Sequence, residues 1–136
     1  MVCQSGGRLA LQRCTVTDNA AVGILAHRLG AECRVSECEV SNNGEMGVAV
    51  QDGAVMVLEQ CNASGNKQAG VYVDGPGAAV RLRDCKLVLS GLRGFGVQGG
   101  GSCDVLKCVI KANTQEGVFV SGRQSRCTVE RADVCG

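Results

Sequence analysis

Apolar and polar residues alternate along many short stretches of this chain. The alternation is clear in Cys33–Arg34–Val35 and in Val80–Arg81–Leu82, where the outer two residues are apolar and the middle one is charged. A period of two is typical of a β-strand that buries one face. No stretch keeps its apolar residues at the 3.6-residue period of an amphipathic helix. The pattern therefore predicts an all-β chain without helices.

The alternating stretches recur at a fixed interval, which a column of cysteines marks. Repeats of one length that run in one direction cannot pair as hairpins. We expect them to coil, with each strand parallel to its counterpart about 4.8 Å away. The interval predicts a single-stranded solenoid of about five to six coils of 23–24 residues, with three short strands and three corners per coil. The column occurs at steps of 24, 23, 24 and 23 residues: Cys14, Cys38, Cys61, Cys85 and Cys108.

Two further columns keep step with the cysteines. An asparagine stands five residues after the cysteine, with Ser90 as the one replacement, and a glycine stands nine residues after it. We expect the asparagines to occupy a bend in the left-handed region, and their stacked amides to hydrogen-bond from coil to coil. We expect the glycines to permit positive φ or a close approach of stacked backbones. The positions with these structural roles are Asn19, Asn43, Asn66 and Asn113, and Gly23, Gly47, Gly70, Gly94 and Gly117.

Two stretches show the repeat most fully. They read GVAVQDGAVMVLEQCNASGN from Gly47 to Asn66 and GVYVDGPGAAVRLRDCKLVLS from Gly70 to Ser90. Over essentially the whole chain the pattern resembles the right-handed parallel β-helix repeats of the pectate-lyase-like superfamily. It is most similar to the regular repeats of F-box β-helix proteins and of sugar-binding and sugar-hydrolase β-helix regions. The resemblance implies a right-handed coil, which also agrees with the usual hand of parallel crossovers.

The repeat occupies the chain as one domain, residues 1–136, without a linker or a second domain. The first and last residues both fall inside a coil, since Val2 or Cys3 matches the second valine of the G-V-x-V element. The open ends of a solenoid expose apolar surface and unpaired strand edges. We therefore expect a segment of a longer array that continues into flanking coils, with end-to-end self-association as the competing explanation.

Composition narrows the classes of partner. The net charge is +1, which argues against a nucleic-acid binder, and the apolar runs are too short to span a membrane. Ten cysteines in 136 residues suggest a disulfide scaffold at first sight. The inward column accounts for five of them, and a second inward column for Cys33, Cys103 and Cys127, as reduced filler of a thin core. This favours a reducing, intracellular compartment. Neighbouring coils would still permit disulfides in an oxidising one. The spacings contain no zinc-binding C-x-x-C pair, so we expect no metal and no cofactor.

In such a fold, the side chains that bind ligands or catalyse reactions lie in the outward-facing rows. Leu25, Ala49, Tyr72 and Phe119 fall in one outward row and predict a small apolar stripe for a protein partner, although scattered exposed apolar residues are also common. In the enzymes of the resembled superfamily, the equivalent face carries the substrate cleft, with clustered acidic residues. Here Asp52 and Asp74, in successive coils, are the weak candidates for an acid/base pair. Both also suit turns.

Three functions remain open on this basis. The first is a non-enzymatic β-helix module that presents a binding or scaffold surface to a protein or another ligand. The second is a fragment of a polysaccharide lyase or glycoside hydrolase, which would bring a carbohydrate to the same face. The third is a structural spacer or self-assembling solenoid. The sequence favours the first, because the outward row that would bear catalysis carries no carboxylate and no base.

Overall fold

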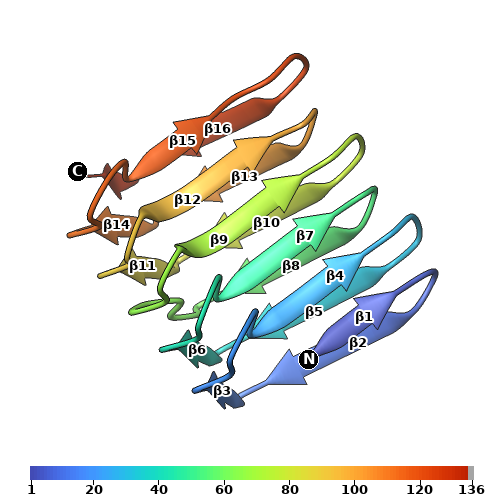
Figure 1. The fold of residues 1–136 in the computed structure, drawn as a ribbon, viewed down its shortest axis with the longest axis horizontal. Helices are drawn as coiled ribbons and strands as arrows, with labels where there is room; N and C mark the ends of the chain where they lie inside the picture. Colours follow the sequence, from blue (N-terminus) through green and yellow to red (C-terminus); the bar gives the residue numbers. More distant parts are fainter. Residues whose placement is uncertain (135–136) are drawn as a thin grey trace.

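The computed structural model describes residues 1–134, and its strands follow one another around a stack of about six coils. The stack has the N-terminus at one end and the C-terminus at the other (Figure 1). All strand neighbours are parallel, and the described residues contain no helix. The predicted all-β parallel solenoid is therefore confirmed.

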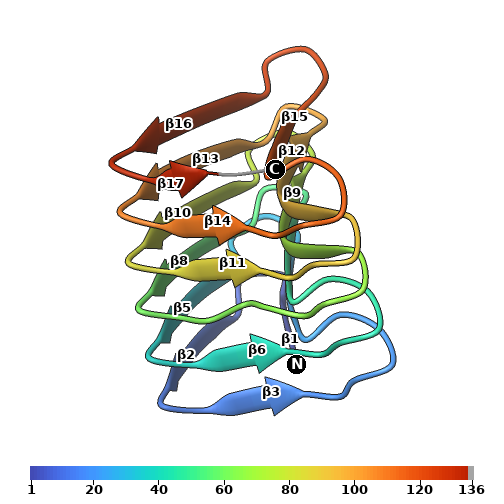
Figure 2. The ribbon, with the colours of Figure 1, turned by 90° about the vertical axis from the view of Figure 1, so that its left-hand side faces the viewer.

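Three sheets run along the stack, and each coil contributes one strand to the first and one to the second (Figures 1 and 2). The first sheet holds, in order, β1 (Val2–Gln4), β4 (Ile24–His27), β7 (Val48–Gln51), β9 (Ala69–Asp74), β12 (Arg93–Gln98) and β15 (Val118–Val120). The second sheet holds β2 (Arg8–Gln12), β5 (Glu32–Ser36), β8 (Val55–Glu59), β10 (Ala79–Arg83), β13 (Ser102–Leu106) and β16 (Arg126–Glu130).

The third sheet is shorter and is interrupted once. It consists of β3 (Thr15–Thr17) with β6 (Glu39–Ser41), and of β11 (Lys86–Val88), β14 (Val109–Lys111) and β17 (Asp133–Val134). In the coil between these two groups, Asn62 alone bridges Glu39 on one side and Lys86 on the other. The predicted three strands per coil are thus reduced to two strands and a bridge in the third coil.

The core is a thin column of small, aliphatic and sulfur-containing side chains. Inward residues stack in register from coil to coil, as in Val48, Val71 and Phe95 of the first sheet, which are all fully buried. Four of the five column cysteines are buried, and Cys14 in the first coil is half-buried. All nine cysteines among residues 1–134 are free thiols, while Cys135 lies outside the described residues.

Each of the three corners contains residues with positive φ. At the first corner, between the first and second sheets, Gly6, Gly30, Gly53, Gly77 and Gly100 have φ between 76° and 89°. At the second corner, between the second and third sheets, φ lies between 50° and 53° in a row that contains neither glycine nor asparagine. The sequence pattern did not reveal this second bend. Its residues are Arg13, Glu37, Gln60, Asp84, Lys107 and Arg131.

The third corner, between the third and first sheets, corrects one expectation. The left-handed residue is the one that precedes each asparagine of the column, and not the asparagine itself. The reason is that the asparagine side chain must point into the stack to reach the next coil, so the bend is made one residue earlier. The residues with positive φ are Asp18, Asn42, Gly65, Leu89 and Ala112.

The buried asparagines connect consecutive coils. Oδ1 of Asn43 accepts from the backbone N–H and the Nδ2 of Asn19 at 3.1 and 2.9 Å, and Oδ1 of Asn66 accepts in the same way from Asn43 at 3.0 and 2.9 Å. The glycine column leaves room for these amides, because a Cβ on Gly47 would lie 2.5 Å from Nδ2 of Asn66. These glycines are therefore required for close approach rather than for positive φ.

Candidate functional site

The predicted apolar row lies on the outer face of the first sheet. Leu25, Ala49, Tyr72 and Phe119 occupy one register position, with Gly96 between the two aromatic residues. Leu25, Tyr72 and Phe119 are half-buried, but Ala49 is completely covered. The row is therefore not a continuous exposed stripe, because Ala49 is covered and Gly96 has no side chain.

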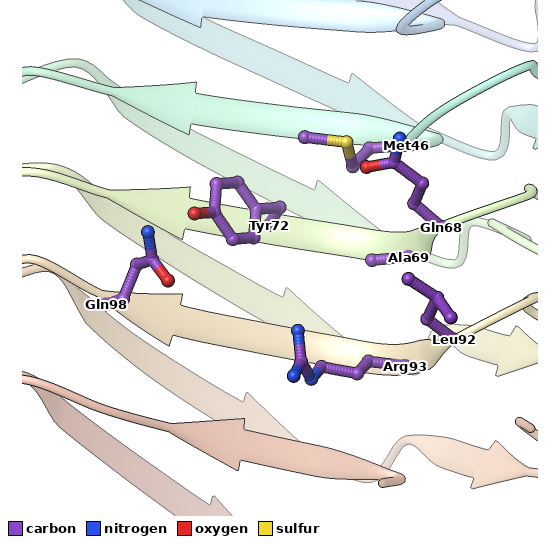
Figure 3. A pocket seen from close by; sticks show the side chains of 7 residues that line it. All are labelled: Met46, Gln68, Ala69, Tyr72, Leu92, Arg93 and Gln98. Carbon is purple, nitrogen blue, oxygen red and sulfur yellow. The ribbon is translucent and has the colours of Figure 1, made fainter. Parts of the chain in front are cut away.

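A hollow of about 210 Å³ opens on this face beside Tyr72. Figure 3 shows the side chains of Tyr72 and Arg93 on the adjacent strands β9 and β12, with Gln98 at one end of the group and Met46 at the other. Gln68 and Leu92 belong to the third-corner turns that lead into these two strands. The lining residues are Met46, Gln68, Ala69, Tyr72, Leu92, Arg93 and Gln98.

Gly96 lies between the two sides of the hollow. A Cβ at Gly96 would lie 3.4 Å from Cδ2 of Tyr72 and 3.9 Å from Cδ of Arg93. Both are ordinary van der Waals distances, so the position has room for a methyl group, and only a larger side chain would compete with Arg93 for the space across the strand. The guanidinium carbon of Arg93 is 3.9 Å from the ring centroid of Phe119, which is a cation–π contact.

Arg93 is held in this position by an ion pair as well. Its Nε donates to Oε2 of Glu116, one coil further on, at 3.0 Å. A hydrogen bond from the backbone of Glu116, together with the bond from Arg93, lowers the pKa of the Glu116 carboxyl. The Phe119 ring and the Glu116 carboxylate thus fix the guanidinium at the edge of the hollow.

At the edge of the hollow opposite Arg93, the Tyr72 hydroxyl belongs to a small cluster of polar side chains. This hydroxyl donates to Oδ2 of Asp74 at 3.4 Å, and Nε2 of Gln98 donates to the same oxygen at 3.4 Å. Partial burial of the ring, and then the neighbouring Asp74 charge, raise the pKa of Tyr72, while Arg93 acts in the opposite direction. The hollow therefore has a basic edge, an apolar floor and a hydroxyl–amide edge.

The two candidate acidic residues have different partners. Asp74 lies in register with Gln51 and Gln98, whereas Asp52 is one position further along, at the first corner, with φ 50°. Oδ2 of Asp52 lies 2.9 Å from Nε2 of His27 in the preceding coil. Asp74 instead accepts from Tyr72 and Gln98, as above. The role of the two carboxylates in catalysis stays a prediction.

The contact between His27 and Asp52 was not foreseen from the sequence. The residues are 25 positions apart, one more than the longest coil step, so they belong to adjacent register rows. A comparison of equivalent positions in successive coils does not detect contacts between a residue and the diagonal neighbour of its register partner. The Asp52 side chain is 61% exposed, so this pair lies at the surface of the corner.

Sequence reasoning missed five residues around the hollow: Met46, Gln68, Ala69, Leu92 and Arg93. A signal for them is present in the chain, because the repeat breaks at the turn before β12. Leu89 stands where the other coils have Asp, Asn, Gly or Ala and is 66% exposed, Ser90 replaces the column asparagine, and Leu92 is a second exposed leucine in this turn, at 37%. Three departures within four residues mark this turn as different from its equivalents in the other coils.

Within residues 1–134, no group of three or more His, Cys, Asp or Glu side chains is placed to hold a metal ion. The same residues include no helix with the length and apolar character needed to cross a membrane.

Comparison with known proteins agrees with the architecture. The family described as right handed beta helix region matches residues 1–134, which is nearly the whole chain. No curated protein and no solved structure matches the chain. The match fits the pectate-lyase-like superfamily in broad terms and confirms the expected hand of the coil. With its stacked parallel strands and its repeat of 23–24 residues, the chain belongs to the family of right-handed β-helix regions.

Proposed function

We propose that this chain is a non-enzymatic binding module, and that the hollow beside Tyr72 takes an extended segment of a protein partner. The observation that carries the proposal is the break in the repeat at Leu89, Ser90 and Leu92, directly beside the hollow. Departures from locally favourable choices are expected where function, and not folding, selects the residues.

The chemistry of the lining suits a protein segment. Tyr72 and Arg93 belong to the residue types that dominate binding energy at protein interfaces. Met46 and Leu92 add flexible apolar surface, and Gln68 and Gln98 offer amide donors and acceptors. The hollow, at about 210 Å³, is smaller than the roughly 300–1,000 Å³ of ordinary small-molecule sites. It has room for one or two side chains of a partner that continues along the sheet.

The lining also favours binding over catalysis. Its seven residues include no carboxylate, histidine, serine or cysteine. The one hydroxyl is that of Tyr72, whose raised pKa makes it a poor base or nucleophile near neutral pH. Arg93, the one charged group, already lies between Phe119 and Glu116. Such fixed, pre-ordered groups are typical of a recognition surface.

The test is a selection of displayed peptides on the purified chain, followed by affinity measurement. We expect enriched peptides to share a consensus, and to lose at least about tenfold in affinity against Arg93→Ala and against Leu92→Asp. Arg34→Ala, on the exposed face of the second sheet, is the matched control and should bind normally. Absence of enrichment, or equal binding to all three variants, would refute the proposal.

A carbohydrate-active fragment is the second candidate, favoured by the contact of Asp52 with His27 at the first corner. It predicts cleavage of oligosaccharides that is lost in Asp52→Asn or Asp74→Asn. A chain without cleavage activity, or variants that cleave as well as the wild type, would count against it. The solenoid spacer remains a third prediction, and sedimentation at high concentration tests its self-association.

A further inference from the structure

The five cysteines of the inward column hold their thiols in one common orientation. Each Sγ donates to the carbonyl oxygen of the residue two positions before it. Because the rotamer repeats with the coil, the sulfur atoms stack in a row at the coil spacing of about 4.8 Å. We call these five thiols the thiol column. The bonds are Cys14 to Gln12, 3.3 Å; Cys38 to Ser36, 3.1 Å; Cys61 to Glu59, 3.3 Å; Cys85 to Arg83, 3.3 Å; and Cys108 to Leu106, 3.3 Å.

The column is continuous through the interior. The residue after each of these cysteines pairs with the residue after the next one, so the cysteines themselves are aligned from coil to coil. The pairs are Glu39 with Asn62, Asn62 with Lys86, and Lys86 with Val109. Cys38, Cys61, Cys85 and Cys108 are each at most 3% exposed.

The spacing decides what chemistry the column can support. A disulfide needs Cβ atoms about 3.5–4.5 Å apart and an S–S bond of about 2.05 Å. The Cα spacing alone permits the disulfides considered from the sequence. Parallel stacking, however, keeps the Cβ atoms and the sulfurs near about 4.8 Å, so oxidation would require two coils to move toward each other. A metal–thiolate bond is about 2.3 Å long, and two of them in line span about 4.6 Å. The column therefore fits an ion between two sulfurs better than it fits a disulfide.

We propose that neighbouring thiols of the column bind a soft cation that takes two thiolates in a straight line, and that Hg(II) is the ion with the matching charge. Thiolates are the preferred ligands of soft ions. Two S–H bonds break, two S–Hg bonds form, both protons pass to solvent, and mercury keeps its oxidation state. The product is neutral, whereas a monovalent ion between two thiolates would leave a buried negative charge, which is costly.

The linear arrangement predicts how many ions each cysteine variant binds. Each sulfur serves one ion, so five thiols in a row hold two ions. Removal of Cys85 leaves three thiols in a row and one alone, which together hold one ion. Removal of Cys61 leaves two separate pairs, which still hold two. Cys33 lies in register with Leu9 and Met56, not with a cysteine, so its removal should change nothing.

The experiment is a titration of the reduced full chain with Hg(II) in competition with a coloured chelator, which reports the number of ions bound. The ultraviolet absorption of the sulfur-to-mercury charge transfer is the second readout. We expect Cys85→Ala to bind one equivalent fewer than the wild type, and Cys61→Ala and Cys33→Ala to bind the same number. About two protons should be released per ion, and X-ray absorption should show two sulfur neighbours.

The proposal would be overturned if Cys61→Ala and Cys85→Ala lost the same number of bound ions, because thiols that bind independently would not depend on their place in the row. A third sulfur neighbour around mercury would overturn it as well. If Cys85→Ala fails to fold, the pair Cys38→Ala and Cys14→Ala gives the same contrast. The former should lose one equivalent and the latter none.

Discussion

The side-chain oxygen of Ser90 is buried and has no hydrogen-bond partner among residues 1–134. In the neighbouring coils the equivalent position is Asn66 or Asn113, whose Nδ2 donates to a carbonyl of the preceding coil at 3.0 or 3.2 Å. Ser90 still donates its backbone N–H to Oδ1 of Asn113. Its hydroxyl is too short to continue the row toward Asn66. One residue therefore divides the asparagine column into two parts.

Restoring the amide should stabilise the fold. In Ser90→Asn, Oδ1 can accept from Asn66 and Nδ2 can donate to the carbonyl of Ala63, and Gly70 leaves space for it as Gly47 does for Asn66. We expect a gain of about 1 kcal/mol in the free energy of unfolding, the usual net value of one or two hydrogen bonds. Urea denaturation measures it. Asn66→Ser should lose stability, and a loss in Ser90→Asn would show that the site has no room for the amide.

At the scale of the element, the turn from the third sheet into β12 is the irregular one. The left-handed position of this corner is Gly65 in the third coil and Leu89 in the fourth. Leucine in that region carries a steric cost of about 1–2 kcal/mol, because its Cβ crowds the following carbonyl. The side chain recovers little of this cost, since it is 66% exposed. The turn is therefore held in place by its neighbours and not by its own sequence.

Leu89→Gly should consequently stabilise the chain by about 0.5–1 kcal/mol, despite the larger backbone entropy that glycine loses on folding. Thermal unfolding should show a higher midpoint. Leu29→Gly is the matched control, because Leu29 is 82% exposed at the first corner and is not among the residues with positive φ. That variant should be neutral or destabilised. A destabilised Leu89→Gly would mean that the leucine side chain makes contacts that outweigh its strain.

The same turn shows which parts of the structure could be predicted from the sequence. The inward columns repeat along the whole stack and the glycines of the first corner in five of its coils, so each copy supports the next and the fold follows from them. The second corner uses residues as different as Arg13, Glu37 and Gln60 in one backbone conformation, which no residue type signals. The hollow needs Arg93 to lie across the strand beside Gly96, and that depends on side-chain direction between coils. Repetition reveals what the coils share, whereas the candidate site lies where one coil differs.

At the scale of the molecule, reduced cysteines are a large part of the core, and this links stability to alkaline pH. Burial raises the pKa of Cys33 from its ordinary value of 9.0 to about 12. Between these values the unfolded chain loses the proton while the folded chain keeps it. The contribution of this thiol to stability is therefore full below about pH 9 and is lost as the pH rises toward about 12.

Unfolding in urea at a series of pH values should show this decline. Cys33→Ala should reduce the slope in that window, by up to one proton, while it lowers the stability near pH 7 through the loss of a buried side chain. Arg34→Ala, one residue away on the outer face, should leave the slope unchanged. A wild-type chain whose stability is flat from pH 9 to 12 would show that the Cys33 thiol ionises equally in both states.

The stack as a whole should respond to a single charge in its core. Val71 is fully buried, in register with Val48 in the preceding coil and Phe95 in the following one. Asp at this position would have no basic partner inside the column, so Val71→Asp should cost at least about 3 kcal/mol. Since each coil is stabilised mainly by its neighbours, the loss should extend beyond β9.

Hydrogen exchange can follow that spread. Amides of β7, β9 and β12 should lose protection first, and those of β1 and β2 last, because they are separated from Val71 by intact coils. Val55→Asp, at a position that is 42% exposed on the second sheet, should cost no more than about 1 kcal/mol. Uniform loss of protection in Val71→Asp would show that the coils unfold as one unit, and an unaffected β12 would show that the inward column does not couple them.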